Sequence, residues 1–345
     1  MKTLIEGYRN FPGEHCGSVS MRGLLHHYCG LELSEPAVFG LASGVACVYL
    51  EGEAFDPARM LFGRSMGLET DLTDNLQIDY REQTEEDDDL AWQKVREEVL
   101  AGRPTMLSGD ILYLDYREYK VHFPGHRFVL LGFDDETEKV WIADRLRVEP
   151  ELCSYGALRR SRNPPEGLST NNLWGRFHGT EVGRSLAEAS RVAIDRCAKA
   201  MLSTSDSDGP GAGSMTTGIR AIRRFAEDLG EWPARADASW LASYNSRCIE
   251  KFGNGGGNFR RLYAGFLEWV PTVDASLVAA DAASHATAAA DGWTALSTTL
   301  ADLARDAGDA DGWKRARRQA LEIADREEAL FSSLAQGAPR GSLQT

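Results

Sequence analysis

The sequence predicts an α+β domain followed by an all-α helical domain, and three observations support this fold class. In the first half, the apolar residues change from helical spacing to short strand-like runs. After about residue 180, alanine becomes frequent, helical spacing persists and no convincing strand pattern is found. The chain of 345 residues is long enough for two domains. We therefore expect a first domain over residues 1–180, a helical domain over 181–336 and a flexible tail over 337–345.

Composition and charge argue against several classes of protein. Hydrophobic residues make up 43% and charged residues 26% of the chain, as in ordinary globular proteins. A net charge of −14 without a long basic tract argues against nucleic acid as a main partner. No run approaches the roughly 20 apolar residues that cross a bilayer, and the first residues lack the apolar core of a signal peptide. We therefore expect a cytoplasmic protein with no membrane partner. Its six scattered cysteines form no Cys-x-x-Cys pair, which predicts free thiols and no metal site.

Two helices are expected in the first domain. Residues 17–29 place small and apolar side chains three and four positions apart, and Gly30 follows as a stop signal. Residues 90–100 come after an acidic run, which favours the positive end of a helix dipole. Gly102 and Pro104 are expected to end this second helix.

Short apolar runs after the second helix predict strands. They span residues 105–108, 127–133 and 139–143. The turn-rich segment 134–137 separates the last two runs, a pattern typical of a β-hairpin.

The second half contains one clear helical seam and one polar segment. Apolar residues recur at near-heptad spacing from Trp313 to Leu334 and are interrupted at Glu327, which indicates a helix of a bundle. Residues 203–214 are rich in Ser, Gly and Asp, and they predict a mobile loop.

Cys16 is the candidate nucleophile. It stands immediately before the first predicted helix, so its sulfur would lie where unpaired backbone N–H groups and the helix dipole favour a thiolate. Gly17, which follows it, lets a substrate approach closely. Taken alone, a cysteine near a helix start is more often a packing residue, so its partners decide the interpretation.

His126 and Asp144 are the candidate partners. His126 precedes the second predicted strand and Asp144 follows the third, so the two can be neighbours at one end of the hairpin. A cysteine at a helix start, a histidine on a strand and an aspartate on the adjacent strand is the papain-like order of nucleophile, base and orienting group. His15 is a rival base, although adjacent residues rarely aim their side chains at each other. Asn10 would supply a side-chain N–H to an oxyanion.

Further polar residues are candidates for substrate binding. Asp110 follows a predicted strand and either lines the same site or acts as a turn or capping residue. The glycine-rich residues 253–257 precede Arg260 and Arg261, which would bind an anion such as the phosphate of a phosphopantetheine arm. The alternative for this stretch is a close helix-packing corner.

A resemblance to a known family is carried by five sequence blocks. The first half contains HCGSVSMRGLLHHYCGLELSEPAVFGLASGV, GRPTMLSGDILYLDY and GHRFVLLGFDDETEKVWIADR, which resemble the N-terminal domain of the butirosin biosynthesis protein H family. The second half contains GIRAIRRFAEDL and FGNGGGNFRRLYAGFLEW, which are similar to the helical domain that accompanies it. The resemblance implies a papain-like fold and a Cys-His-Asp site, with counterparts at Cys16, His126 and Asp144.

The resemblance also implies an activity. It implies an acyltransferase that takes an acyl group from a carrier-protein thioester, holds it on the cysteine and passes it to an amine of a small natural product such as an antibiotic. The donor would be a phosphopantetheine thioester on an acyl carrier protein, the acceptor a small-molecule or peptide amine, and no bound cofactor is expected. Two alternatives stay open: a cysteine peptidase or amidase whose acyl-enzyme is resolved by water, and a non-catalytic binding subunit of a biosynthetic cluster.

Overall fold

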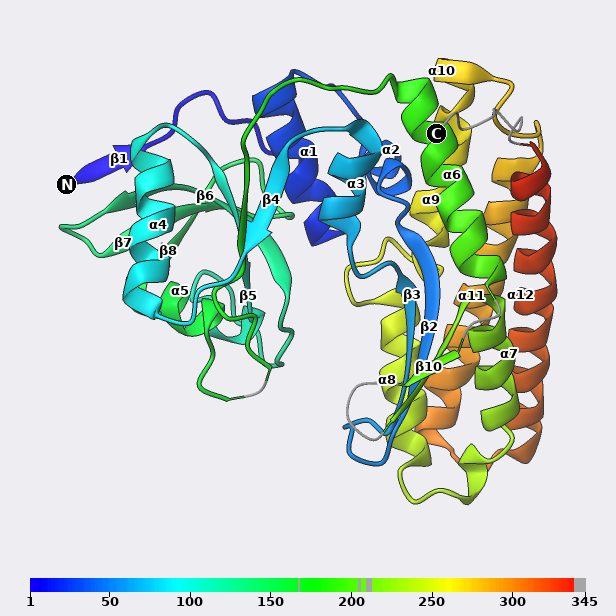
Figure 1. The fold of residues 1–345 in the computed structure, drawn as a ribbon. Coiled ribbons are helices and arrows are strands. Elements are labelled where there is room, and N and C mark those ends of the chain that lie inside the picture. Colours follow the sequence, from blue (N-terminus) through cyan, green and yellow to red (C-terminus); the bar gives the residue numbers. More distant parts are fainter. Residues whose placement is uncertain (167, 204–205, 209–212, 338–345) are drawn as a thin grey trace. The chain divides into compact units, whose positions relative to one another are not determined.

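The computed structural model describes residues 1–166, 168–203, 206–208 and 213–337 (Figure 1). The described chain forms two compact units, each built from two separate segments. The first unit contains Met1–Val38 and Glu69–Gly183. The second contains Phe39–Leu68 and the chain from Arg184 onward. The fold class is α+β, as predicted, with a sheet domain at the amino terminus and a helical region at the carboxyl terminus.

The first unit is built around an antiparallel sheet. The described strands of this sheet are β1 (Lys2–Leu4), β4 (Tyr80–Gln83), β5 (Thr105–Gly109), β6 (His126–Asp134), β7 (Lys139–Ala143), β8 (Glu151–Ser154) and β9 (Trp174–Phe177). They lie in the order β4-β9-β5-β6-β7-β8, and β1 pairs with β6. The accompanying helices are α1 (Cys16–Cys29), α3 (Leu68–Leu76), α4 (Asp88–Leu100), the 3-10 helix η1 (Ile111–Tyr113) and α5 (Tyr155–Arg162), while α2 (Glu35–Leu41) crosses the boundary between the units.

The local predictions for this unit are confirmed. Helices α1 and α4 match the predicted helices, and Gly30 ends α1 in the left-handed conformation at φ 64°. Strands β6 and β7 form the predicted hairpin, with Asp134 opposite Lys139. Alternate residues of β5 and β6, among them Leu107 and Phe128, are buried in a core with side chains of α4 and α5. The hairpin therefore has one face fixed by this core, with Val129 of β6 opposite Ala143 at the end of β7.

The second unit is mainly helical. Its described elements are β2 (Val45–Glu51), β3 (Arg59–Arg64), α6 (Leu186–Leu202), β10 (Asp206–Asp208), β11 (Ser214–Thr217), α7 (Gly218–Asp228), η2 (Trp232–Ala234), α8 (Ala238–Glu250), α9 (Arg260–Trp269), α10 (Pro271–Asp274), α11 (Ala282–Arg305) and α12 (Ala310–Gly337). The predicted seam of α12 is buried from Trp313 to Leu334. Its basic residues Lys314, Arg315, Arg317 and Arg318 are exposed.

The domain limits and the strand content differ from the prediction. Residues 39–68 were assigned to the first domain, but strands β2 and β3 form a sheet of order β10-β11-β2-β3 within the second unit. The prediction that no strand follows residue 180 is therefore wrong. Strands β10 and β11 are short and carry no apolar alternation. Strand β11 pairs with β2, far earlier in the chain, and β10 pairs with β11.

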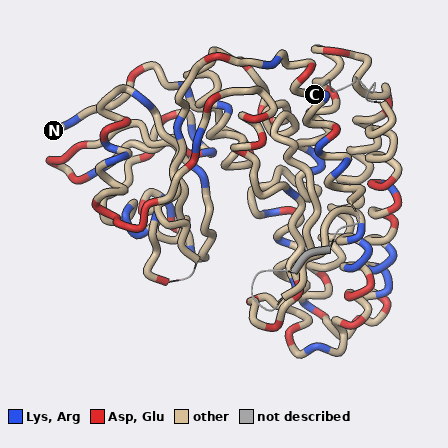
Figure 2. The backbone as a smooth tube through the Cα atoms, viewed as in Figure 1, with Lys and Arg blue, Asp and Glu red and all other residues tan. Residues whose placement is uncertain are grey.

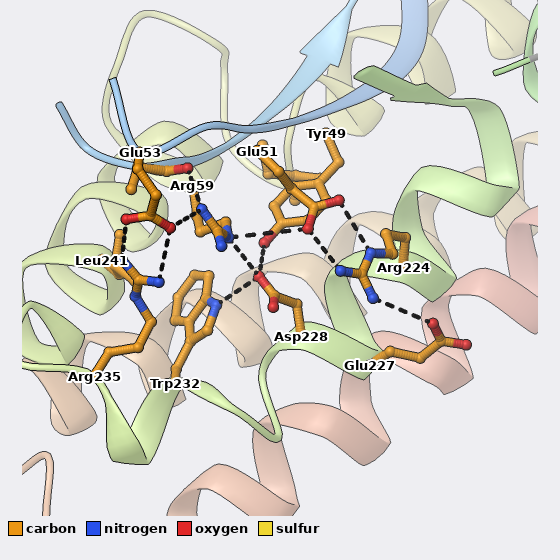
Figure 3. Close-up of polar contacts among 12 residues, drawn as sticks. Tyr49, Glu51, Glu53, Arg59, Arg224, Glu227, Asp228, Trp232, Arg235 and Leu241 are labelled. Atoms are coloured by element: carbon orange, nitrogen blue, oxygen red, sulfur yellow. Dashed lines mark hydrogen bonds and ion pairs between the residues drawn. The ribbon is translucent and has the colours of Figure 1, made fainter. Parts of the chain in front are cut away.

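A polar network explains why the β2–β3 hairpin belongs to the second unit. The Asp228 carboxylate of α7 accepts hydrogen bonds from the Tyr49 hydroxyl at 2.5 Å and from Arg59 Nε at 3.1 Å (Figure 3). It also accepts from Trp232 Nε1 at 3.0 Å. In the same network, Arg224 binds the Glu51 carboxylate through Nε and Nη2. These bonds fasten both strands of the hairpin to α7 and η2.

The predicted loop over residues 203–214 is partly extended structure. Residues 206–208 form β10 and Ser214 begins β11, whereas 204–205 and 209–212 lie outside the described residues. Of the predicted flexible tail, only Gly337 is described, and it ends α12. Figure 2 shows acidic and basic residues interspersed along the elements of both units. Within the part of the chain that the structure describes, no helix has the length and apolar character needed to cross a bilayer.

Candidate active site

Cys16 is the first residue of α1, where the sequence predicts it. His15 is the N-cap of this helix: its backbone is extended, and its Nδ1 accepts from the Ser18 backbone N–H at 3.3 Å. The same ring nitrogen lies 2.9 Å from Ser18 Oγ. The rival base His15 thus caps α1. The Cys16 residue is 8% exposed to solvent.

The segment that enters α1 is held by Glu35. The Glu35 carboxylate accepts from the backbone N–H of Glu14 at 3.0 Å and of His15 at 2.7 Å. Burial raises the pKa of Glu35, against the lowering effect of these two hydrogen bonds. A side chain at Gly13 would collide with the Glu35 carboxylate. These contacts fix the backbone immediately before Cys16.

His126 and Asp144 meet at one end of the β6–β7 hairpin, as the sequence predicts. His126 is the first residue of β6, and Asp144 directly follows the last residue of β7. The distance from His126 Nε2 to Asp144 Oδ1 is 3.0 Å, and both side chains are buried. The imidazole also hydrogen-bonds the Cys16 side chain. Because Asp144 holds Nε2, the ring nitrogen that faces the thiol is Nδ1.

Asp144 is held in its ionised form by several neighbours. Its Oδ2 accepts from the Tyr116 hydroxyl at 3.1 Å, and its Oδ1 accepts from the Arg145 backbone N–H at 2.6 Å. Burial raises the pKa of this carboxyl, but the charge and hydrogen bond of His126, the Arg145 N–H and the charge of Arg117 together hold it well below its usual range.

The imidazole of His126 is correspondingly basic. Burial lowers its pKa, but the attraction of Asp144 and Cys16 outweighs burial and raises the pKa of His126 to about 10. The ring is therefore positively charged near neutral pH. A buried cation that contacts a sulfur at a helix amino terminus favours the thiolate form of that sulfur, which is the form that attacks a carbonyl carbon.

Asn10 does not have the role that the sequence suggested. Its side-chain amide nitrogen donates to the backbone carbonyl of Asp144 at 2.7 Å and to that of Arg147 at 2.6 Å. The two amide hydrogens are therefore occupied, and the assignment of Asn10 as an oxyanion donor is wrong. Asn10 instead fixes the turn that presents the Asp144 carboxylate.

Asp110 is a capping residue and not a free substrate ligand. It is 1% exposed, and its Oδ1 accepts from the backbone N–H of Leu112 and Phe123. Its Oδ2 lies 2.7 Å from His122 Nδ1. The carboxylate thus closes the loop around η1, which is the turn interpretation of this residue.

Arg260 is likewise a structural residue. It is 1% exposed, and its Nε and Nη2 form a bidentate pair with the Glu327 carboxylate at 2.7 and 2.8 Å. Its Nη1 donates to backbone carbonyls, including that of Gly63 at 2.8 Å. A guanidinium engaged in this way offers nothing to a phosphate, so the prediction of Arg260 as a substrate ligand is wrong.

The glycine stretch before Arg260 is a packing corner. Gly253, Gly255, Gly256 and Gly257 adopt positive φ angles. A Cβ at Gly257 would lie 2.6 Å from the Ala290 side chain of α11. Arg261 lies at the surface, where it pairs with Asp291 at 3.1 Å and donates to Thr294. Its predicted role in substrate binding stays a prediction.

Arg127 was missed by the sequence analysis. It directly follows His126 inside a strand, and its side chain is only 11% exposed. The signal for it was a charged residue inside an otherwise apolar run, because such a residue needs buried partners of opposite charge.

Two family models match this chain. Residues 15–145 match the family model described as butirosin biosynthesis protein H, N-terminal, a range that contains Cys16, His126 and Asp144. Residues 158–334 match the model of a domain of unknown function, DUF4872. A comparison with curated proteins found no match. On these two consecutive matches, the chain belongs to the butirosin biosynthesis protein H family.

Proposed function

We propose that this protein is a cysteine-dependent acyltransferase that forms an amide bond through an acyl-Cys16 intermediate. His126 and Asp144 complete its catalytic triad, in the papain-like arrangement that the sequence suggests. The observation that carries the proposal is the double engagement of one imidazole, which bonds Asp144 Oδ1 at 3.0 Å and also the Cys16 side chain.

In the first step, the Cys16 thiolate attacks the carbonyl carbon of a thioester. The bond between that carbon and the donor sulfur then breaks, and the departing thiolate takes the proton from the His126 imidazolium. Acyl-Cys16 and a neutral imidazole remain. This exchange of one thioester for another is nearly balanced in energy, so the residues around Cys16 mainly position the reactants and exclude water.

In the second step, an amine attacks acyl-Cys16. The bond between the acyl carbon and Cys16 sulfur breaks, and the amine proton passes to His126. The products are an amide and the original thiolate–imidazolium pair. Asp144 keeps the imidazole in one orientation through both steps and stabilises its positive charge. Backbone N–H groups at the amino end of α1 are the oxyanion donors in this proposal.

The family description supports a role in natural-product biosynthesis, because it names the biosynthesis of butirosin. We extend this to a phosphopantetheine thioester on an acyl carrier protein as donor and an amine of a small molecule or peptide as acceptor. No described residue is assigned to the phosphate of that donor, since Arg260 is buried in an ion pair.

Intact-mass spectrometry with a model thioester tests the proposal. We expect a single acyl adduct on Cys16 that decays faster, with formation of the amide, when an amine is added. Cys153→Ala is a matched control, because Cys153 is a buried cysteine of the same unit whose pKa burial raises. It should still form the adduct. An adduct that decays only by hydrolysis, whatever amine is offered, would identify a hydrolase instead.

A further inference from the structure

A strip of polar residues crosses one face of the sheet in the first unit. The strand register places Glu82 of β4 opposite Gly175 of β9, and Ser108 of β5 opposite Arg127 of β6. Met106 of β5 also lies opposite Gly175, so these strands share one alternation of side chains. Because successive side chains of a strand point to opposite faces, Glu82, Ser108 and Arg127 share a face. Leu107 and Phe128 lie on the other face, in the apolar core.

Arg127 is the centre of this strip. Its Nε lies 3.3 Å from Glu69 Oε1, and its Nη2 lies 3.2 Å from Glu82 Oε1. The Tyr80 hydroxyl donates to Glu82 at 3.0 Å. Burial lowers the pKa of Arg127, but the two carboxylates outweigh burial and hold it above its usual range. One guanidinium charge is thus matched by two carboxylates.

Two buried polar atoms of the strip lack partners among the described residues. One is Arg127 Nη1 and the other is Ser108 Oγ, and the Ser108 residue is 0% exposed. Residues paired across antiparallel strands have their Cβ atoms about 5 Å apart, so the two side chains start from adjacent positions on the same face of the sheet. A buried donor without an acceptor destabilises a protein, and two of them on one face of the sheet point to a ligand that supplies the acceptor.

The strip lies beside the candidate nucleophile. The charge of a Cys16 thiolate is one of the causes of the raised pKa of Arg127. Helix α1, which begins at Cys16, packs against β6. An acyl group on the Cys16 sulfur is therefore attached within electrostatic range of Arg127, whose strand partner is Ser108.

We propose that Arg127 Nη1 and Ser108 Oγ donate hydrogen bonds to an uncharged oxygen of the acyl chain that Cys16 carries, and so select polar acyl groups. This inference rests on the proposed function. The acceptor is uncharged because Glu69 and Glu82 already exceed the charge of Arg127, and a carboxylate on the acyl chain would add a third negative charge. An amide or hydroxyl oxygen accepts both hydrogen bonds without this repulsion.

Three model thioesters of similar length test the selection, with the rate of adduct formation on Cys16 as the measurement. The glutaramyl thioester ends in an amide, the hexanoyl thioester is apolar and the glutaryl thioester ends in a carboxylate. We expect kcat/KM to be about tenfold or more higher for glutaramyl than for hexanoyl, because an apolar chain leaves both donors unpaired. We expect glutaryl to be the slower of the two polar substrates.

Variants assign the selection to the two side chains. Ser108→Ala and Arg127→Lys each remove one of the donors, and each should lower the glutaramyl-to-hexanoyl ratio by about fivefold. Arg127→Lys retains a positive charge against Glu69 and Glu82. Ser190→Ala is the control, because Ser190 of α6 also has a buried hydroxyl without a partner among the described residues. It should leave the ratio unchanged.

Thermal unfolding separates a ligand site from a structural role. The ligand-free Ser108→Ala variant should melt at the wild-type temperature or above it, because the substitution removes an unpaired buried hydroxyl. A clearly lower melting temperature would mean that the hydroxyl stabilises the fold, and would overturn the inference. Equal rates for glutaramyl and hexanoyl, or a faster glutaryl, would overturn this inference alone. Absence of any adduct on wild-type Cys16 would overturn the proposed function as well.

Discussion

His126 Nε2 lies 3.0 Å from Asp144 Oδ1, where His126 begins β6 and Asp144 directly follows β7. The contact orients the ring so that Nδ1 faces Cys16, and it stabilises the imidazolium. We therefore expect Asp144→Asn to fold but to acylate Cys16 about 10²- to 10⁴-fold more slowly than wild type. Single-turnover kinetics with a model thioester measure this. A wild-type rate in Asp144→Asn would show that the carboxylate has no part in the reaction.

Asn10 holds the backbone segment that carries the Asp144 carboxylate. Its amide donates to the carbonyls of Asp144 and Arg147, so Asn10→Ala should destabilise the protein by about 2 kcal/mol, roughly 1 kcal/mol for each hydrogen bond. Urea unfolding measures this loss, with the helix-surface substitution Gln93→Ala as a control. An oxyanion donor would behave differently: its removal would slow acylation without a loss of stability.

The raised pKa of His126 makes stability depend on pH. The pKa is about 10 in the folded protein and 6.5 ordinarily, so the protonated ring favours the folded state. This contribution is complete below pH 6.5 and is lost as the pH rises through about 10. Because Cys16 is a thiolate in the folded protein but a thiol in the unfolded chain up to about pH 8.5, the two proton changes cancel between pH 6.5 and about 8.5. We therefore expect the free energy of unfolding to fall mainly between about pH 8.5 and 10, and to fall less in Asp144→Asn.

Exposed aspartates provide the control for this pH dependence. Asp79 pairs with Arg81 at the surface, so Asp79→Asn should lose stability between about pH 8.5 and 10 as steeply as wild type does. Urea unfolding at several pH values compares the three proteins. Parallel curves for wild type and Asp144→Asn would contradict the assignment of the raised pKa to the Asp144 pair.

The sequence could predict those parts of the fold whose signals are local. Helices α1 and α4 and strands β5 to β7 have regular spacing with stop signals, and Cys16, His126 and Asp144 stand at their ends. The pairing of β2 with β11 could not be found in this way, because it joins residues about 165 positions apart through a polar strand.

The errors among the site residues have a common physical origin. Residue type and position indicate that Asn10 and Arg260 can donate hydrogen bonds, but they do not identify the acceptors. The Asn10 amide donates to a backbone carbonyl distant in sequence, and the Arg260 guanidinium donates to a carboxylate distant in sequence. One signal was present for Arg260: Glu327 interrupts an apolar seam, and a charged residue at a buried position requires a partner.

The Arg260–Glu327 pair leads to a stability prediction. Glu327 is 0% exposed and also accepts from Trp293 Nε1 at 2.6 Å. Glu327→Gln leaves the buried guanidinium without its counter-charge and should destabilise the second unit by about 3–5 kcal/mol. Chemical unfolding measures this. The surface substitution Asp291→Asn, which breaks the pair with Arg261, should cost less than about 1 kcal/mol.

The acyl-enzyme is the central claim, and mass spectrometry of wild type beside Cys16→Ala tests it most directly. After incubation with a model thioester, wild type should gain the mass of one acyl group, located on the peptide that contains Cys16, and should transfer it to an added amine. Cys16→Ala, folded by circular dichroism, should gain nothing. Equal labelling of the two proteins, or labelling of wild type on other cysteines only, would contradict the account.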